Sequence, residues 1–311
     1  MSNKPKLRLG TRGSELARTQ SGTVAASLAA AGFEVELVII KTAGDQNQTA
    51  LFGSIGPQGV FVREIEQALV EKRIELAVHS FKDLPTQSPA ELVVAAVPER
   101  VDPADLLLVR RSALGGDEKE FIPLAKSAKV GTASARRRVW LKHFRPDLNI
   151  EPLRGNVPTR LRKLMEGGYD AIVLAAAGVE RLKAERKLLG DLGEIEFLRL
   201  DPVKFVPAPA QGALALQCRR DNRRVLAALA TIDHAPSHAA VKAERDALAR
   251  AEGGCDVAFG AYCIKRTGNA HELLVMHERN GVVRSARVRG RDPKKLGAIA
   301  WATLDARGDE S

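Results

Sequence analysis

Along the first half of the chain, short continuous apolar runs alternate with longer stretches in which apolar residues recur every three to four positions. Short β-branched and leucine-rich runs predict buried strands, and the longer stretches between them have the spacing of helices with one apolar face. The expected strands are 6–10, 35–41, 76–79, 128–131, 149–153 and 171–175, and the expected helices are 14–31, 60–72, 135–144 and 159–166. Strands that alternate with helices predict α/β layers with mainly parallel sheets.

Two proline-containing segments interrupt this pattern and predict domain crossings. Residues 98–103 hold two prolines among charged residues, and residues 207–212 read Pro-Ala-Pro-Ala-Gln-Gly. A strand-like run at 213–218 follows the second crossing, so we expect the chain to return to its first domain. The boundaries predicted are 1–104 together with 210–230 for a first α/β lobe, and 105–209 for a second.

The tail begins with a helical stretch at 238–251, and strand-like runs follow at 272–277 and 281–289. This pattern predicts a small third α/β domain over residues 231–311.

Composition narrows the range of partners. The 48 basic and 38 acidic residues give a net charge of +10, which favours a polyanionic partner, either nucleic acid or a small molecule with many carboxylates. A solvated basic surface would give the same charge.

Three cysteines argue against a disulfide framework, and we see no secretory leader and no apolar run of membrane-spanning length. We therefore expect a cytoplasmic protein that does not enter membranes.

Polar residues cluster after four of the expected strands, at 11–14, 79–83, 131–138 and 154–160. Ligands of open α/β sheets bind beyond the carboxyl ends of strands. Arg136 and Arg137 stand in the first turn of a helix, where the helix dipole disfavours a cation by up to about 1 kcal/mol, and Arg12 and Arg160 lie near other helix starts. A bound anion would reverse that sign, whereas solvated arginines are the alternative. Removal of such a cation from an unliganded helix should cost little stability.

The arginines therefore predict a polycarboxylate or a polyphosphate as ligand. A nucleoside triphosphate is disfavoured because the sequence lacks the glycine-rich loop with Lys-Ser or Lys-Thr that cradles its phosphates.

Lys82 and Asp83 place a cation beside a carboxylate at the end of an expected strand. Asp83 could donate a proton or stabilise a cationic intermediate, although a surface ion pair would have the same sequence.

Cys255 follows two glycines, which suits a nucleophilic or attachment role, while a buried thiol is the alternative. Cys218 and Cys263 lie in strand-like runs and suit the core.

The histidines raise the question of a metal. His234 and His238 have i, i+4 spacing, but Cys255 and Cys263 lie too far apart for a usual zinc pair, so we expect no metal site.

Five segments occur in the order and at the distances found in one enzyme family. They read LGTRGSELA from Leu9, HSFKDLP from His79, VGTASARR from Val130, LRGNV from Leu153 and EGGC from Glu252. With them the chain resembles the hydroxymethylbilane synthase (porphobilinogen deaminase) family along nearly its whole length. Each segment alone is a weak signal, whereas the ordered set is specific.

The resemblance implies three α/β domains, of which the first two are similar to the lobes of a type II periplasmic binding protein with the active cleft between them. It implies a transferase that joins four porphobilinogen molecules head to tail, loses ammonia at each step and releases hydroxymethylbilane. The primer would be a dipyrromethane cofactor attached through a thioether to Cys255. Asp83 would be the catalytic carboxylate, with Lys82 beside it.

The resemblance also assigns binding residues. Those expected to hold the cofactor are Cys255, Lys82, Asp83, Thr132, Ser134, Arg136, Arg137 and Arg154. Those expected to bind substrate are Arg12, Ser14, Arg154, Arg160, Arg181 and Gln211. Porphobilinogen would be the small-molecule substrate, and we expect a monomer with no nucleic-acid or membrane partner.

Two departures from the family pattern affect these expectations. The loop 53–59 contains no lysine where family members usually have lysines, and Ala210 stands where the family has glycine. Two other classes of protein remain as alternatives: a non-catalytic anion-binding protein of the same two-lobed shape, and a nucleic-acid binder, against which the aromatic content of 4% counts. A covalent mass excess of two pyrrole units is expected only for the enzyme.

Overall fold

The computed structural model describes residues 5–41, 62–115, 120–184, 192–251 and 258–306. The first lobe is a five-stranded sheet in the order β2-β1-β3-β10-β4. Its strands are β1 (Lys6–Thr11), β2 (Glu34–Ile39), β3 (Leu76–Ser80), β4 (Leu92–Ala96) and β10 (Leu214–Arg219). Its helices are α1 (Glu15–Ala30), α3 (Arg63–Val70) and α7 (Arg223–Ala230). Side chains of α1 and α7 share one apolar cluster with the sheet, and α3 packs in a separate cluster with β3 and β4.

The second lobe repeats this plan with the order β7-β6-β8-β5-β9. Its strands are β5 (Asp105–Arg110), β6 (Lys129–Gly131), β7 (Asn149–Glu151), β8 (Ala171–Ala175) and β9 (Ile195–Arg199). Its helices are α4 (Ala135–Phe144), α5 (Val157–Met165) and α6 (Ala176–Ala184), with a short 3-10 turn at Arg111–Ala113. The apolar cluster that holds α4 and Trp140 also takes in Met276 of the C-terminal sheet, so this lobe and the tail share a core.

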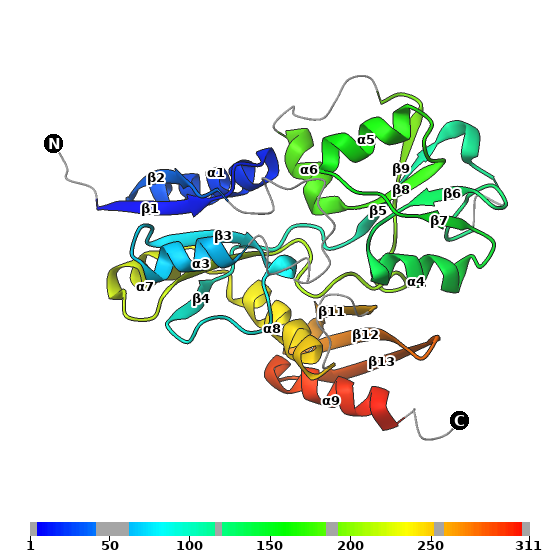
Figure 1. Cartoon of the computed structure of the whole chain (residues 1–311). Coiled ribbons are helices and arrows are strands. Elements are labelled where there is room, and N and C mark those ends of the chain that lie inside the picture. The colour runs from blue at the N-terminus through cyan, green and yellow to red at the C-terminus, as the bar shows by residue number, and fades with distance from the viewer. Residues whose placement is uncertain (1–4, 42–61, 116–119, 185–191, 252–257, 307–311) are drawn as a thin grey trace.

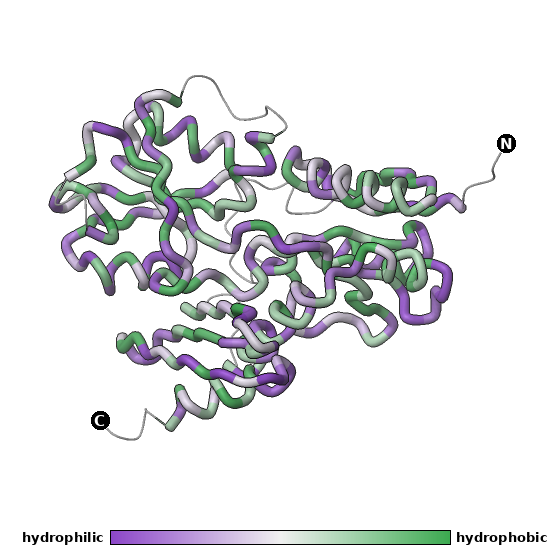
Figure 2. The backbone as a smooth tube through the Cα atoms, turned by 180° about the vertical axis from the view of Figure 1, so that it is seen from behind, coloured by the Kyte–Doolittle hydropathy of each residue, from purple (hydrophilic) through white to green (hydrophobic). Residues whose placement is uncertain are grey.

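The tail forms a three-stranded antiparallel sheet, β11 (Phe259–Lys265), β12 (His271–Arg279) and β13 (Val282–Gly290), with a 3-10 turn at Thr267–Asn269. Helices α8 (Ala235–Arg250) and α9 (Pro293–Ala306) cover one face of it. We call these elements the C-terminal unit. Figure 1 shows α8 between the first lobe and this sheet, and Figure 2 shows hydrophobic residues along the strands inside the lobes.

The expectation of mainly parallel sheets is wrong. In the first lobe β1 pairs in parallel with β2 and β3, whereas β10 is antiparallel to β3 and β4. In the second lobe β6 is parallel to β7 and β8, whereas β5 is antiparallel to β8 and β9. The exceptions, β5 and β10, are the strands that follow the two crossings between lobes, so each enters its sheet from the opposite end.

The predicted fold class is confirmed: two α/β lobes in the arrangement of a type II periplasmic binding protein, followed by a small α/β unit. The domain boundaries stay a prediction. Local signals placed several elements well. The Ser14 hydroxyl accepts a hydrogen bond from the Ala17 amide at the start of α1, and Gly32 ends that helix with φ at 95°. Within the described segments, no helix is long and apolar enough to cross a membrane.

Candidate active site

A 3-10 turn, η2 (Phe81–Asp83), follows β3 directly and carries Lys82 and Asp83. Phe81 is 6% exposed, and its amide donates to the carbonyl of Ala213, the residue just before β10. Lys82 is half-buried and Asp83 is exposed. The buried ring therefore anchors the turn, while the carboxylate faces outward at the carboxyl end of the strand.

Gln211 connects this turn to both crossings between the lobes. Its side chain is fully buried, and Lys82 Nζ lies 3.3 Å from its Oε1. On the other side, its Nε2 donates to the Pro103 carbonyl at 2.8 Å and to Asp105 Oδ1 at 2.9 Å. Because its side-chain amide contacts Lys82 on one side and Pro103 and Asp105 on the other, Gln211 links the two lobes.

Asp105 lies at the centre of a buried charged cluster in the second lobe. Its carboxylate has no solvent exposure; Arg136 Nη2 lies 2.8 Å from one oxygen and Arg137 Nη2 lies 2.7 Å from the other. Although burial alone would raise the pKa of Asp105, the two guanidinium charges hold it at about 2. The cluster carries a net positive charge.

The cluster overturns the interpretation of Arg136 and Arg137 as cations opposed only by a helix dipole. They are 4% and 6% exposed, and each also donates to a backbone carbonyl, Arg136 to Val206 and Arg137 to Val173. Asp105, which supplies their negative charge, is not among the residues that the sequence segments single out. A carboxylate just before the apolar run 106–109 and just after a crossing was the available signal. Whether the two arginines also bind cofactor stays a prediction.

The charges of the two lobes act on one another across this junction. Burial lowers the pKa of Lys82 to about 8, with Asp83 opposing the shift and Arg137 adding to it. Burial and, to a smaller extent, the charge of Arg137 lower the pKa of Arg160 to about 10, and the charge of Asp83 opposes this shift. Asp83 of the first lobe therefore lies within electrostatic reach of Arg160 in the second, as a site between the lobes requires.

The remaining predicted residues lie around the same junction or at helix starts. Arg181 donates to the Gly212 carbonyl at 3.2 Å, and Arg160 Nε donates to the Gly155 carbonyl at 2.7 Å. Arg154 is exposed and Arg12 is half-buried.

The predicted hydroxyl groups take part in local hydrogen bonds. The hydroxyls of Ser14 and Ser134 cap α1 and α4, and Thr132 Oγ1 accepts from the Ser134 amide. Each hydroxyl keeps a hydrogen that it can donate to a ligand.

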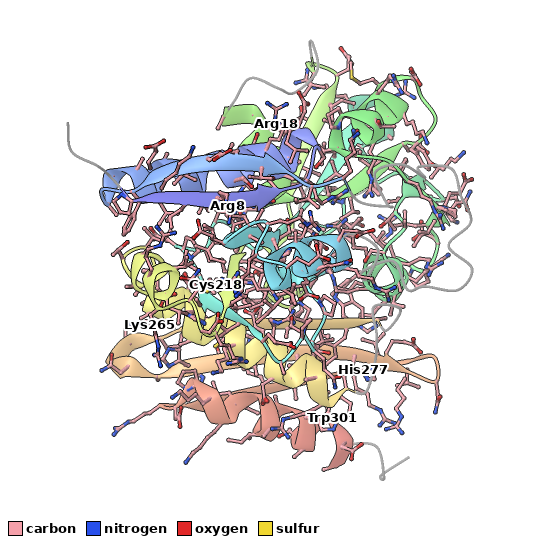
Figure 3. All side chains as sticks on the ribbon, turned by 60° about the vertical axis from the view of Figure 1, so that its left-hand side comes forward. Arg8, Arg18, Cys218, Lys265, His277 and Trp301 are labelled. Carbon is pink, nitrogen blue, oxygen red and sulfur yellow. The ribbon has the colours of Figure 1, made fainter. Side chains whose placement is uncertain are left out.

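Two of the three thiols lie in the core, as the sequence predicts. Cys218 and Cys263 are 0% and 4% exposed, and burial raises their pKa to about 11 and about 12. Figure 3 shows Cys218 in the interior. Both are therefore protonated near neutral pH and unsuited to nucleophilic attachment. Cys255 and the loop 53–59 lie outside the described residues.

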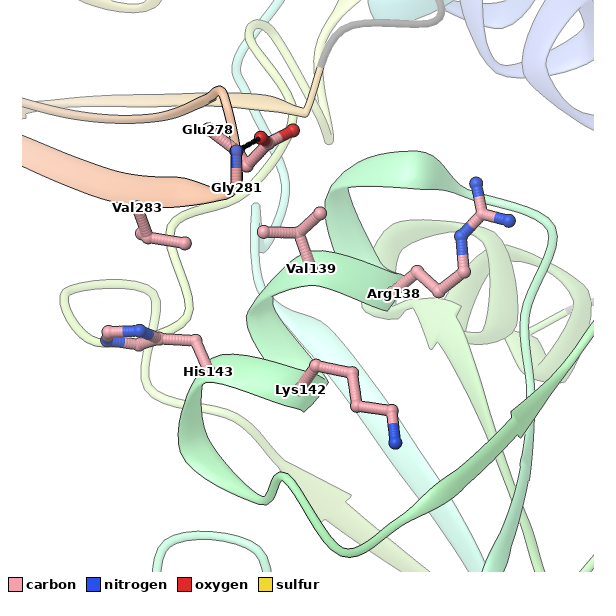
Figure 4. A pocket seen from close by; sticks show the side chains of 7 residues that line it. All are labelled: Arg138, Val139, Lys142, His143, Glu278, Gly281 and Val283. Carbon is pink, nitrogen blue, oxygen red and sulfur yellow. Dashed lines mark hydrogen bonds between the residues drawn. The ribbon is translucent and has the colours of Figure 1, made fainter.

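Two other features lie apart from this chemistry. His79 is buried, which lowers its pKa to about 4, and its Nε2 lies 2.9 Å from Gln217 Oε1, so it is a neutral core residue. A surface pocket of about 420 Å³ lies between α4 and the β12–β13 turn, with Val139 and Val283 facing each other across it (Figure 4). None of the predicted site residues lines it.

The fold and the junction together define a two-lobed α/β protein in which an exposed carboxylate and an excess of arginines meet where the lobes join. A family model described as "Porphobilinogen deaminase, dipyromethane cofactor binding domain" matches residues 7–227. The chain belongs to this porphobilinogen deaminase family.

Curated relatives agree along nearly the whole chain. The porphobilinogen deaminase of Brevibacillus brevis is 42% identical over 97% of this chain and 95% of that protein. That of Syntrophobacter fumaroxidans is 42% identical over 82% of this chain and 79% of that protein, and that of Bacillus thuringiensis is 39% identical over 97% and 95%.

Similar solved structures include the periplasmic VFT2 domain of Bordetella pertussis BvgS and an arginine-specific periplasmic binding protein of Salmonella typhimurium. The first has a TM-score of 0.43 and 12% identity over 75% of this chain and 88% of that one. The second has a TM-score of 0.40 and 12% identity over 73% and 92%. These likenesses are distant, and the fold assignment rests on the strand orders given above.

The predicted reaction and cofactor are thereby confirmed. The chain is a transferase of tetrapyrrole biosynthesis that condenses porphobilinogen molecules to hydroxymethylbilane, with release of ammonia, on a dipyrromethane cofactor.

Proposed function

We propose that the reaction takes place at the junction between the lobes and that Asp83 is its catalytic carboxylate. The single observation that carries this proposal is the position of Asp83: exposed on a turn anchored by Phe81, beside Lys82, and within electrostatic reach of Arg160 in the other lobe. Loss of ammonia from porphobilinogen leaves a cationic electrophile, and a fixed carboxylate nearby stabilises that charge or transfers a proton.

Arg12, Arg154, Arg160 and Arg181 bind the acetate and propionate groups of the substrate in this proposal. Arg160 and Arg181 lie at the junction, where cations outnumber carboxylates. Guanidinium groups suit carboxylates because both are planar and can form paired hydrogen bonds. Arg136 and Arg137 act mainly through their charge, because Asp105 already accepts from both of them.

Lys82 contributes a second cation close to Asp83. Its amine is held by Gln211, so its position depends on the contact between the lobes. A pKa of about 8 leaves it mostly charged near neutral pH, able to pair with a carboxylate of the substrate or with Asp83.

The residues present fit a dipyrromethane cofactor. The buried Nε of Arg136 has no hydrogen-bond partner among the described residues, and the surrounding arginines favour a group with several carboxylates. Lys82, Thr132, Ser134, Arg136, Arg137 and Arg154 would hold it, together with Asp83 at the pyrrole N–H groups. When bound, the cofactor supplies the pyrrole carbon to which the first substrate unit is joined.

Cys255 carries the cofactor in this proposal. The supporting observation is that Cys218 and Cys263 are buried and have raised pKa values, which leaves Cys255 as the thiol suited to a thioether. We also propose that the protein acts as a cytoplasmic monomer without a nucleic-acid partner, which gel filtration of the holoenzyme at two ionic strengths would test.

The attachment is tested by digesting protein made in cells with a working tetrapyrrole pathway and sequencing the modified peptide. We expect a mass excess of two pyrrole units on Cys255, and its loss in Cys255→Ser but not in Cys263→Ser. Modification of Cys218 or Cys263, or an unmodified Cys255, would contradict the proposal.

A further inference from the structure

Arg245, on α8 of the C-terminal unit, is hydrogen-bonded to the turn that carries Lys82 and Asp83. Its Nη1 donates to the carbonyls of Phe81 at 3.1 Å and Leu84 at 2.9 Å, and its Nη2 donates to the carbonyl of Pro85 at 2.5 Å. These carbonyls stand at the start of η2 and just after its end. One side chain from a distant part of the sequence therefore holds both ends of the turn.

The surroundings of Arg245 show that the turn is its main partner. The guanidinium carbon lies 4.6 Å from the centre of the Phe81 ring, and Arg245 forms no ion pair within the described part of the chain. Burial lowers the pKa of Arg245 to about 10. A partly buried cation without a carboxylate costs desolvation energy, which its three carbonyls and the aromatic ring offset.

Other contacts also hold the turn. Within the described residues, its backbone is held by Phe81 N, which donates to the Ala213 carbonyl, and by Leu84 N, which donates to the Phe81 carbonyl at 3.3 Å. Lys82 Nζ also donates to Gln211 Oε1 at 3.3 Å. Arg245 therefore adds three hydrogen bonds to those that hold the backbone around Asp83.

The preceding residue, Glu244, ties the same helix to the crossings between the lobes. Its carboxylate is fully buried and accepts from Arg100 Nη1 at 2.6 Å and from the Ala210 amide at 2.7 Å. Helix α8 ends at Arg250, five residues before Cys255. The helix thus contacts the turn through Arg245 and contacts the crossings through Glu244.

We propose that Arg245 is a positioning residue for the condensation reaction: it fixes the turn of Lys82 and Asp83 to α8, so that Asp83 keeps one position relative to the C-terminal unit. This inference rests on the proposed role of Asp83. Since misplacement of a catalytic group by about 1 Å can cost about 100-fold in rate, loss of these contacts should lower the rate of the chemical step rather than substrate affinity.

The test compares three holoenzyme variants whose cofactor loading has been checked by intact mass. Arg245→Met keeps the length of the side chain and removes all its donors. Arg245→Lys keeps the charge with an ammonium that cannot reach three carbonyls in the same way. Arg250→Met is the matched control on the same helix, since that arginine is exposed and pairs with Asp246.

We expect the single-turnover rate of Arg245→Met to fall at least about tenfold, with KM changed less than about threefold, an intermediate rate in Arg245→Lys, and the wild-type rate in Arg250→Met. Rates of Arg245→Met and Arg245→Lys within about twofold of wild type would overturn the proposal. If Arg245→Met does not fold, the rate of Arg245→Lys alone decides.

A double-mutant cycle separates this inference from the role of Asp83 itself. If Arg245 acts through Asp83, adding Arg245→Met to Asp83→Asn should lower the rate by less than about twofold further. A full additional loss would show that Arg245 acts elsewhere and would overturn the positioning role. An Asp83→Asn rate near wild type would instead overturn the proposed function, whatever Arg245 does.

Discussion

The guanidinium of Arg136 lies 2.8 Å from the carboxylate of Asp105, and their side chains are 5% and 0% exposed. Asp105 opens the strand that follows the first crossing, and Arg136 lies in the first turn of α4. The pair therefore holds the start of α4 against the start of β5, where the chain enters the second lobe from the first.

Arg136→Leu should consequently destabilise the cofactor-free protein. Removing one partner of a buried ion pair typically costs about 3–5 kcal/mol, and we expect the lower end because Arg137 and Gln211 still contact Asp105. The exposed Arg154 is the matched control, and Arg154→Leu should cause no measurable loss. The free energy of unfolding in urea measures both. Equal losses for the two variants would show that the ion pair does not stabilise the fold.

Lys82 gives the reaction a specific pH dependence. With a pKa of about 8, Lys82 is charged below that pH and neutral above it, whereas arginine stays charged throughout. We therefore expect the ratio of the single-turnover rates of Lys82→Arg and wild type to rise as pH increases through about 8. Using the ratio cancels titrations that both proteins share, including those of the substrate. A ratio that stays constant between about pH 7 and pH 9 would show that the charge of Lys82 is not needed.

Gly212 allows the second crossing to pass close to the first. Its φ is +87°, and a Cβ at this position would lie 2.7 Å from the Val101 carbonyl oxygen. Gly212→Ala should cost about 3 kcal/mol or more, because strain in φ and a backbone clash add. Gly32 is the control: its φ is +95° with no atom within 4 Å, so Gly32→Ala should cost only about 1 kcal/mol. Chemical denaturation gives both values, and similar losses would remove the argument for a close approach.

The sequence predicts local features of this fold better than long-range ones. The predicted bounds of α4 and β8 agree with the structure, since an apolar period and capping residues are local signals. The directions of β5 and β10 depend on which lobe each strand comes from, and the pattern of a strand does not encode that. The prediction of mainly parallel sheets failed for this reason.

The candidate site shows the same difference between local features, which the sequence predicts, and long-range contacts, which it does not. The family segments point to Lys82, Asp83 and the arginines. In the structure, Lys82 and Arg160 each lie within electrostatic reach of both Asp83 and Arg137. The sequence misses Asp105 and Arg245, because each contacts its partners across a large sequence separation. A charged residue in a mostly apolar segment was the only local sign of Asp105.

The role of Asp83 is the central claim, and single-turnover kinetics of Asp83→Asn test it most directly. Asparagine keeps the size of the side chain but can neither carry the charge nor transfer the proton. The variant must first be shown by mass to carry its cofactor, because the same site is expected to assemble it. Asp221→Asn, at the opposite end of β10 with a side chain 73% exposed, is the control. The account predicts a loss of about 100-fold or more in folded, loaded Asp83→Asn and none in the control, and a rate within about tenfold of wild type would contradict a catalytic charge at this position.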